Sequence, residues 1–137
     1  MAVEPAVVAE LAKKRGVERN TQIMGADTKY WFYPASQKSK GTLVFVHGFR
    51  GAHDGLHTII GELTDYDCYA PDLPGYGSSA PVAKPHDLDT YAEWLGEFIK
   101  SLKLPAKPAV IGHSFGTMVV SAHAAEQRAD MAEVVLI

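Results

Sequence analysis

Hydrophobic and polar residues follow different patterns on the two sides of residue 41. In the first part, residues 5–15 carry apolar side chains at helical spacing, which predicts a short amphipathic helix. Residues 21–24 and 29–33 are rich in strand formers and are separated by a segment that contains glycine and aspartate. We therefore expect a hairpin at the edge of a sheet after the helix.

In the second part, short apolar runs alternate with segments of helical periodicity. The expected strands are residues 42–46, 67–70, 109–111 and 134–137, and the expected helices are residues 54–65, 89–102 and 115–128. The first of these helices is expected to carry Leu56, Ile59, Ile60 and Leu63 on one side. Parallel strands need long crossovers, which are usually helices, so this order predicts a mostly parallel sheet with helices on both faces. The expected fold class is α/β.

No linker or low-complexity tract divides the chain. We expect residues 1–137 to form a single domain, with the helix and hairpin in residues 1–40 and the alternating core in residues 41–137. The strand expected at 134–137 is apolar, as a central strand would be, and nothing in the sequence follows to pair with it. The domain is therefore expected to be partial, truncated after this strand.

The strongest chemical signal is Gly112-His113-Ser114-Phe115-Gly116, a G-x-S-x-G sequence that directly follows an expected strand and opens an expected helix. Such a tight turn holds the serine in a strained backbone conformation, so that its hydroxyl projects clear of the sheet and can attack a carbonyl. Glycine fits at both ends because a side chain there would collide with neighbouring backbone. The motif indicates Ser114 as a nucleophile.

A second motif, His47-Gly48-Phe49-Arg50-Gly51, stands at the end of the strand expected at 42–46. In acyl transfer the carbonyl oxygen becomes negative and needs two backbone N–H donors, one of them from the residue after the nucleophile. That donor is Phe115, and Phe49 is the candidate for the second. Each such donor typically contributes about 100- to 1,000-fold in rate.

A third motif, Asp72-Leu73-Pro74-Gly75-Tyr76-Gly77-Ser78-Ser79, follows the strand expected at 67–70. Aspartate and glycine at these spacings are typical of a rigid turn. We expect Asp72, Gly75 and Gly77 to fix the shape of a loop beside the site, with Asp72 accepting hydrogen bonds from backbone N–H groups rather than acting on substrate.

These three motifs, in this order, resemble the α/β-hydrolase superfamily of esterases, lipases, epoxide hydrolases and carbon–carbon bond hydrolases. The resemblance covers nearly all of the chain from Thr42 onward. It implies an α/β-hydrolase fold, a serine nucleophile, an acid after a later strand and a histidine after the last strand. The last two have no match in the chain, and we expect them, with the lid, beyond Ile137. The tight turn that holds the nucleophile, here residues 112–116, is called the nucleophile elbow. Serine at this elbow argues against the epoxide and haloalkane hydrolase branches, which by resemblance use aspartate there.

The remaining histidines are expected to have other roles. The resemblance gives His47 a structural role, and the tight turn is expected to direct His113 away from Ser114. His53, His57, His86 and His123 are interpreted as packing or surface residues. No pair of histidines has the spacing of a zinc site, and Cys68 is interpreted as a small core residue, so no metal or cofactor is expected.

Composition limits the partners. The 13 basic and 16 acidic residues give a net charge of −3 without a basic stripe, which disfavours nucleic acid as a partner. A single cysteine excludes an intrachain disulfide. The absence of a secretion signal and of a long apolar run favours a cytoplasmic location without a membrane span.

The sequence therefore favours a serine hydrolase that cleaves an ester or related acyl bond in a small, apolar substrate through an acyl-enzyme on Ser114. Two alternatives stay open. One is a catalytically inactive fragment or binding module, because the triad is incomplete. The other is a carbon–carbon bond hydrolase or a perhydrolase, because these enzymes use the same elbow. Substrate identity and oligomeric state are left open by the sequence.

Overall fold

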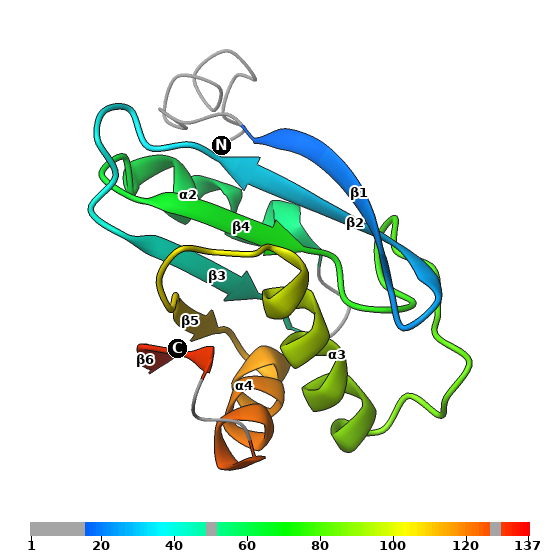
Figure 1. Ribbon diagram of the computed structural model, residues 1–137. Helices are drawn as coiled ribbons and strands as arrows, with labels where there is room; N and C mark the ends of the chain where they lie inside the picture. Colours follow the sequence, from blue (N-terminus) through cyan, green and yellow to red (C-terminus); the bar gives the residue numbers. More distant parts are fainter. Residues whose placement is uncertain (1–15, 49–51, 127–129) are drawn as a thin grey trace, which may run out of the picture.

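The computed structural model describes residues 16–48, 52–126 and 130–137 (Figure 1). The helix expected at residues 5–15 lies outside the described residues, as do Phe49, Arg50 and Gly51.

The described residues form a six-stranded sheet with the order β1-β2-β4-β3-β5-β6. The strands are β1 (Val17–Ile23), β2 (Ala26–Tyr33), β3 (Thr42–Val46), β4 (Asp67–Pro71), β5 (Ala109–Gly112) and β6 (Glu133–Leu136). The pairs β1–β2 and β2–β4 are antiparallel, whereas β4–β3, β3–β5 and β5–β6 are parallel. The expectation of a mostly parallel sheet is confirmed.

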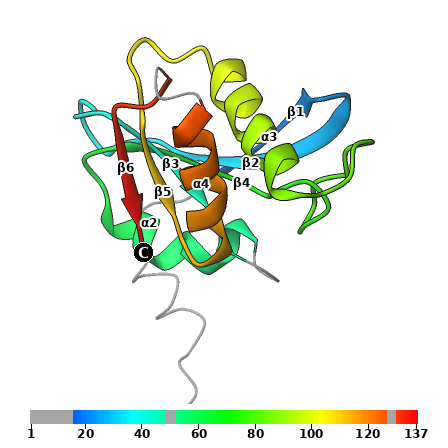
Figure 2. The same cartoon turned by 90° about the horizontal axis from the view of Figure 1, so that it is seen from below.

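Helices cover both faces of this sheet. The helices α3 (Leu88–Ser101) and α4 (Phe115–Glu126) pack on one face, and α2 (His57–Glu62) lies on the other, as Figure 2 shows. Helix α3 begins at the capping residue Asp87, whose side chain accepts a hydrogen bond from the Thr90 N–H. The α/β class with helices on both faces is therefore confirmed.

Two hydrophobic cores correspond to the two faces. On the α3 and α4 face, Trp94 stacks on Phe98 with ring centroids 5.4 Å apart, and both side chains are fully buried. On the α2 face, Phe45, Ile60 and Cys68 belong to the second core. Cys68 is a buried free thiol, as the sequence indicated.

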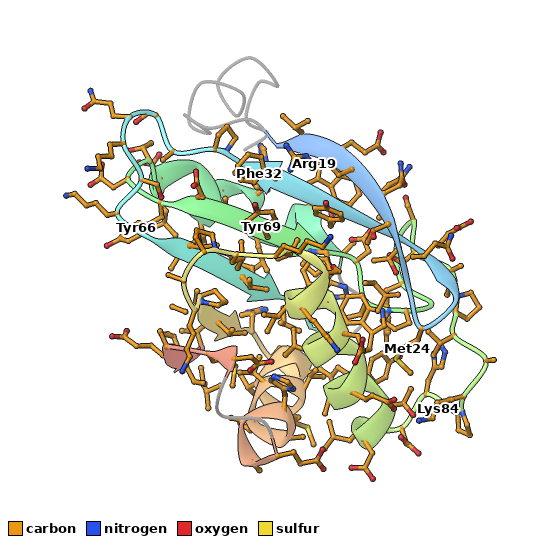
Figure 3. The ribbon with its side chains drawn as sticks, in the orientation of Figure 1. Arg19, Met24, Phe32, Tyr66, Tyr69 and Lys84 are labelled. Carbon is orange, nitrogen blue, oxygen red and sulfur yellow. The ribbon has the colours of Figure 1, made fainter. Side chains whose placement is uncertain are left out.

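The hairpin is longer than the sequence predicted, because β1 begins at Val17 and includes polar residues of an edge strand. Its turn is formed by Met24 and Gly25, which both have positive φ, at 52° and 77°. Two positive φ values in succession are typical of the tight turns that match strand twist. Figure 3 shows Arg19 and Phe32 close together, and the Arg19 guanidinium lies 4.5 Å from the centre of the Phe32 ring.

The helix expected at residues 54–65 is shorter and is divided. A 3₁₀ helix, η1 (His53–Leu56), precedes α2, and Leu56 and Ile60 point into the core. Ile59, which the sequence placed on the same side of the helix as Leu56 and Ile60, is 48% exposed. Ile59 lies about 100° around the helix from Ile60, which places it at the border of the buried side.

At the end of the chain, β6 pairs with β5 and forms one edge of the sheet. Its apolar side chains are exposed, from 40% for Val134 to 55% for the following Ile137. Beside it, an open groove of about 560 Å³ is lined by Phe45, Ile59 and Val135 among other residues. Among the described residues, no helix has the length and apolar character needed to cross a bilayer.

Candidate active site

Ser114 lies in the sharp turn between β5 and α4 and adopts a left-handed backbone conformation with φ of 54°. Among the described residues other than glycine, only Met24 and Lys103 share a positive φ. For a residue with a Cβ this conformation is strained, and such strain gathers at functional sites. Ser114 is exposed although the residues on either side of the turn, Gly112 and Gly116, are buried.

Backbone hydrogen bonds hold this turn in place from both neighbouring strands. The N–H of His113 donates to the carbonyl of Val46 at the end of β3, at 3.0 Å. The N–H of Ser114 donates to the carbonyl of Ile137, which follows β6, also at 3.0 Å. In the first turn of α4, the N–H of Gly116 donates to the carbonyl of His113 at 2.9 Å. The conformation of Ser114 is therefore set by two strands as well as by its own helix.

Close approach of the backbone explains the glycines around Ser114. A Cβ at Gly116 would lie 2.2 Å from the Val46 carbonyl oxygen, and one at Gly112 would lie 2.6 Å from the Gly116 carbonyl oxygen. A Cβ at Gly48 would lie 2.8 Å from the Ser114 Cβ. Gly48 therefore brings the loop after β3 against the serine, so two of the three motifs meet at one point.

His47 joins the loop after β3 to the loop after β4. Its ring is buried, Nε2 accepts a hydrogen bond from the Leu73 N–H at 2.9 Å, and Nδ1 lies 2.8 Å from the Gly48 carbonyl oxygen. A carbonyl accepts and an N–H donates, so this network assigns the proton to Nδ1 of a neutral ring. Both ring nitrogens therefore hold loops together.

Asp72 organises the loop after β4. Its buried carboxylate accepts a hydrogen bond from the Ser78 N–H at 3.0 Å, and its carbonyl accepts one from the Ser79 hydroxyl at 2.7 Å. Gly77 passes so close to this carboxylate that a Cβ there would clash with it, and Gly77 and Gly75 have positive φ of 51° and 80°. These contacts are those of a loop-shaping residue.

Aromatic rings connect this loop to the elbow. Tyr91 of α3 meets the Phe115 ring edge-on at 5.6 Å and the Tyr76 ring at 6.4 Å, and Tyr76 in turn lies 5.5 Å from the His47 ring. Burial, with a smaller contribution from Tyr76, raises the pKa of Tyr91 to about 12. Tyr91 therefore stays neutral at physiological pH and acts as a packing group.

Three further histidines have partners of their own. His57 Nδ1 lies 3.3 Å from the Tyr33 hydroxyl, and His86 contacts Val82 and Tyr91. His123 is buried, with Nε2 2.8 Å from an Asp130 carboxylate oxygen and Nδ1 3.1 Å from the Ala92 carbonyl oxygen.

The pairing of His123 with Asp130 was missed by the sequence analysis, which assigned this histidine to ordinary packing. The pair is seven residues apart and joins the end of a helix to a connecting segment, so no periodic pattern marks it. His123 lies nine residues after Ser114, which corresponds to about 13 Å along α4. The pair is therefore remote from the serine hydroxyl.

A cavity of about 150 Å³ opens beside Ser114. It is lined by His47, Gly48, Ala52, Gly55, Leu56, His113 and Ser114. The lining thus combines the first two motifs with the 3₁₀ helix η1, and His113, which is exposed, shares this cavity with the serine. In the part of the chain that the structure describes, no group of three or more His, Cys, Asp or Glu residues is placed to hold a metal ion.

Curated proteins with similar sequences are named as esterases or lipases. A curated protein of Mycoplasma genitalium, whose name makes it a candidate esterase or lipase, is 37% identical over 100 residues, which are 73% of this chain and 36% of that protein. Lipase 3 of a Moraxella species is 34% identical over 85 residues, covering 61% of this chain and 27% of the lipase. The chain therefore spans about a third of the length of the curated relatives it matches.

Among solved structures, a bacterial membrane phospholipase A described as a virulence factor superposes with a TM-score of 0.81 and 27% identity. The superposition covers 96% of this chain and 41% of the phospholipase. The family model described as alpha/beta hydrolase fold matches residues 41–137, a range that includes all three motifs and every strand from β3 onward. The fold, the three motifs and the family match together show that the chain belongs to the α/β-hydrolase family.

Proposed function

We propose that this chain carries the nucleophile of a serine hydrolase that cleaves an ester or related acyl bond, and that Ser114 is this nucleophile. The observation that carries the proposal is the strained, exposed Ser114 at the junction of β5 and α4, facing a cavity and touching Gly48. A non-glycine residue keeps such a conformation only where its surroundings hold it there. The names of the relatives, esterase/lipase and lipase, support an ester as the substrate class.

The proposed reaction has two halves. The Ser114 Oγ attacks the acyl carbonyl carbon and gives its proton to a histidine, while the Phe115 and Phe49 N–H groups bind the oxyanion. The intermediate then expels the alcohol, which takes the proton from the histidine, and leaves an acyl-enzyme that water hydrolyses. Phe49 lies outside the described residues, so its part in this scheme rests on the motif alone.

The triad base and acid are proposed to come from residues other than those described. At least one ring nitrogen of each of His47, His57, His86 and His123 hydrogen-bonds to another group, as given above. Engagement of these rings also favours the alternative of a module that binds without turnover. A carbon–carbon bond hydrolase or perhydrolase uses the same elbow and stays a second alternative, to be separated from the first by the substrate that is consumed.

A fluorophosphonate probe tests the role of Ser114. The probe is incubated with the chain, with Ser114→Ala and with Ser121→Ala, which removes an exposed hydroxyl from the same helix. We expect modification at Ser114 in the parent chain and in Ser121→Ala, and none in Ser114→Ala, with the adduct located by mass spectrometry. In a well-studied serine protease, the oxyanion hole and substrate binding still give roughly 10³- to 10⁴-fold acceleration over the uncatalysed reaction when triad residues are removed. We therefore expect slow but site-selective labelling.

The contrary results are equally specific. Labelling spread over several serines, or labelling that persists unchanged in Ser114→Ala, would reject Ser114 as the nucleophile. Rapid stoichiometric labelling at Ser114 would mean that residues 1–137 already supply a base, and the proposal that the base lies elsewhere would then be wrong.

A further inference from the structure

Tyr91 connects α3 to the nucleophile elbow. Its side chain is buried, and its ring meets the Phe115 ring edge-on, with centroids 5.6 Å apart and planes at 84°. Backbone hydrogen bonds fix the neighbours of Phe115 in the turn, which are His113, Ser114 and Gly116. The contact with Tyr91 therefore adds a side-chain anchor at the residue whose N–H is proposed to bind the oxyanion.

The same side chain also contacts the loop after β4. The Tyr91 ring lies 6.4 Å from the Tyr76 ring, and the Tyr91 hydroxyl donates to the Pro74 carbonyl at 3.4 Å. Burial, with a smaller contribution from Tyr76, raises the pKa of Tyr91 to about 12, so the hydroxyl keeps the proton that it donates. Tyr76 in turn lies 5.5 Å from the buried His47 ring. Tyr91 therefore stands between the elbow and a loop that reaches the second motif.

His86 provides a further partner for the Tyr91 hydroxyl. Its Nδ1 lies 3.4 Å from the hydroxyl oxygen, and its Nε2 lies 3.2 Å from the Val82 nitrogen and 3.3 Å from the Val82 carbonyl oxygen. A hydroxyl and a peptide group can each donate and accept, so these contacts hold the imidazole in either neutral tautomer. The imidazole also packs on Gly75, where a Cβ would lie 3.2 Å from its Cε1. His86 therefore limits the orientations open to the Tyr91 side chain.

Such support matters for catalysis because an oxyanion donor acts only when it is correctly directed. Each preorganised donor contributes about 100- to 1,000-fold in rate, and a displacement of about 1 Å within an active site can cost about 100-fold. Reacting groups therefore need surrounding side chains that lock their position. Tyr91 is held by polar contacts at its hydroxyl and by ring contacts at its edges, so it can give this support to Phe115.

We propose that Tyr91 is a positioning residue for the proposed reaction. Its ring fixes Phe115 so that the N–H of Phe115 points at the oxyanion, and His86 acts through the Tyr91 hydroxyl. This inference rests on the proposed function, because it takes the Phe115 N–H as an oxyanion donor. It assigns to two side chains outside the three motifs a part in turnover that goes beyond packing.

The test measures fluorophosphonate labelling of Ser114 against probe concentration, which separates the limiting rate from the affinity for the probe. Tyr91→Phe removes only the hydroxyl, Tyr91→Leu removes the ring, and His86→Phe keeps a ring without the two nitrogens. Tyr30→Phe is the matched control, because Tyr30 meets Phe98 of the same helix edge-on at 5.4 Å. Phe98 is seven residues beyond Tyr91, or about 10 Å along α3. Folding of each variant is checked by circular dichroism.

We expect Tyr91→Phe and His86→Phe each to lower the limiting rate about three- to tenfold, and Tyr91→Leu to lower it more than tenfold, with probe affinity changed less than about twofold. The double variant of His86→Phe and Tyr91→Phe should be no slower than Tyr91→Phe, because both changes act through one hydroxyl. Tyr30→Phe should label as the parent does. If Tyr91→Leu does not fold, Tyr91→Phe decides. An unchanged limiting rate in the Tyr91 variants, additive effects in the double variant, or an equal effect of Tyr30→Phe would overturn the inference.

A second measurement does not depend on labelling. The backbone amide of Phe115 is followed by ¹⁵N–¹H NMR at low micromolar protein concentration, and its resonance should shift or broaden more in Tyr91→Phe than in Tyr30→Phe. An amide that responds in a chain that is not labelled at Ser114 would reject the proposed function while supporting the contact. A labelled parent chain whose Phe115 amide and limiting rate ignore Tyr91→Phe would reject the positioning role alone.

Discussion

At the scale of single residues, the conformation of Ser114 links stability to the proposed function. Its positive φ brings the Cβ close to the backbone. The turn can form because Gly48, Gly112 and Gly116 have no Cβ at the points of close approach. The hydroxyl gains exposure and a fixed direction through this strain. A hydrolase needs both properties in its nucleophile, whereas a turn that served only the fold would be more stable with glycine at this position.

This argument predicts that Ser114→Gly is more stable than Ser114→Ala. Both variants remove the hydroxyl, but alanine keeps the strained Cβ, which costs about 1–2 kcal/mol in the left-handed region. Glycine avoids this strain, but its greater freedom in the unfolded chain costs about 0.4–1 kcal/mol and offsets part of the advantage. We expect the free energy of unfolding in urea to be about 0.5–1 kcal/mol higher for Ser114→Gly than for Ser114→Ala. Equal stability of the two variants would show that the turn stores no strain.

At the scale of elements, the site is assembled from the ends of parallel strands. The elbow follows β5, the His47–Gly48 loop follows β3, and the Asp72 loop follows β4, which are neighbours in the sheet. Parallel alignment brings the three carboxyl ends to the same edge, where open α/β sheets bind their ligands. Helix α3 adds Tyr91, which packs between Phe115 and Tyr76.

The sequence predicted an element best where a single clear pattern of residues marks it. The run from Thr42 to Val46 between a glycine and a histidine corresponds residue for residue to β3. The glycines at 112 and 116 indicated a tight turn, and the structure provides the close contacts. Signals failed where geometry depends on tertiary contacts, as in the 3₁₀ helix before α2 and the buried contact of His123 with Asp130, because neither follows a regular spacing.

The His123–Asp130 pair is expected to hold α4 in place. His123 bridges from α4 to the Ala92 carbonyl of α3 and to the segment before β6, so loss of its partner leaves a buried ring nitrogen unsatisfied. Such a loss typically costs about 1–3 kcal/mol. We expect Asp130→Ala to lower the free energy of unfolding by about this amount, measured by urea denaturation.

Two controls separate the pair from a general effect of charge. Asp130→Asn keeps an acceptor and should lose less stability than Asp130→Ala. Glu133→Ala removes an exposed carboxylate nearby and should lie within about 0.5 kcal/mol of the parent chain. A neutral result for Asp130→Ala would mean that water replaces the carboxylate and that the pair is not structural.

At the scale of the whole molecule, the two edges of the sheet have opposite character. The outer strand β1 has few apolar residues and carries the polar residues Glu18, Arg19, Asn20 and Gln22. The other edge, β6, begins at the exposed Glu133 but otherwise presents exposed valine and leucine, and an open groove lies beside it. Natural proteins usually protect edges with charge, as β1 does, because an unprotected apolar edge pairs with other chains.

The isolated chain is therefore expected to self-associate through β6, with the associated fraction rising from about micromolar to millimolar protein. Val135→Lys places a charge on this edge and should shift association to higher concentration, as measured by sedimentation velocity. Val17→Lys places the same charge on the exposed position that begins β1 and should leave association unchanged. A monomeric chain over this concentration range, with a sharp cooperative melt, would contradict the expectation. Equal effects of the two lysines would instead show that net charge controls association. A specific contact at β6 would make the two edges respond differently.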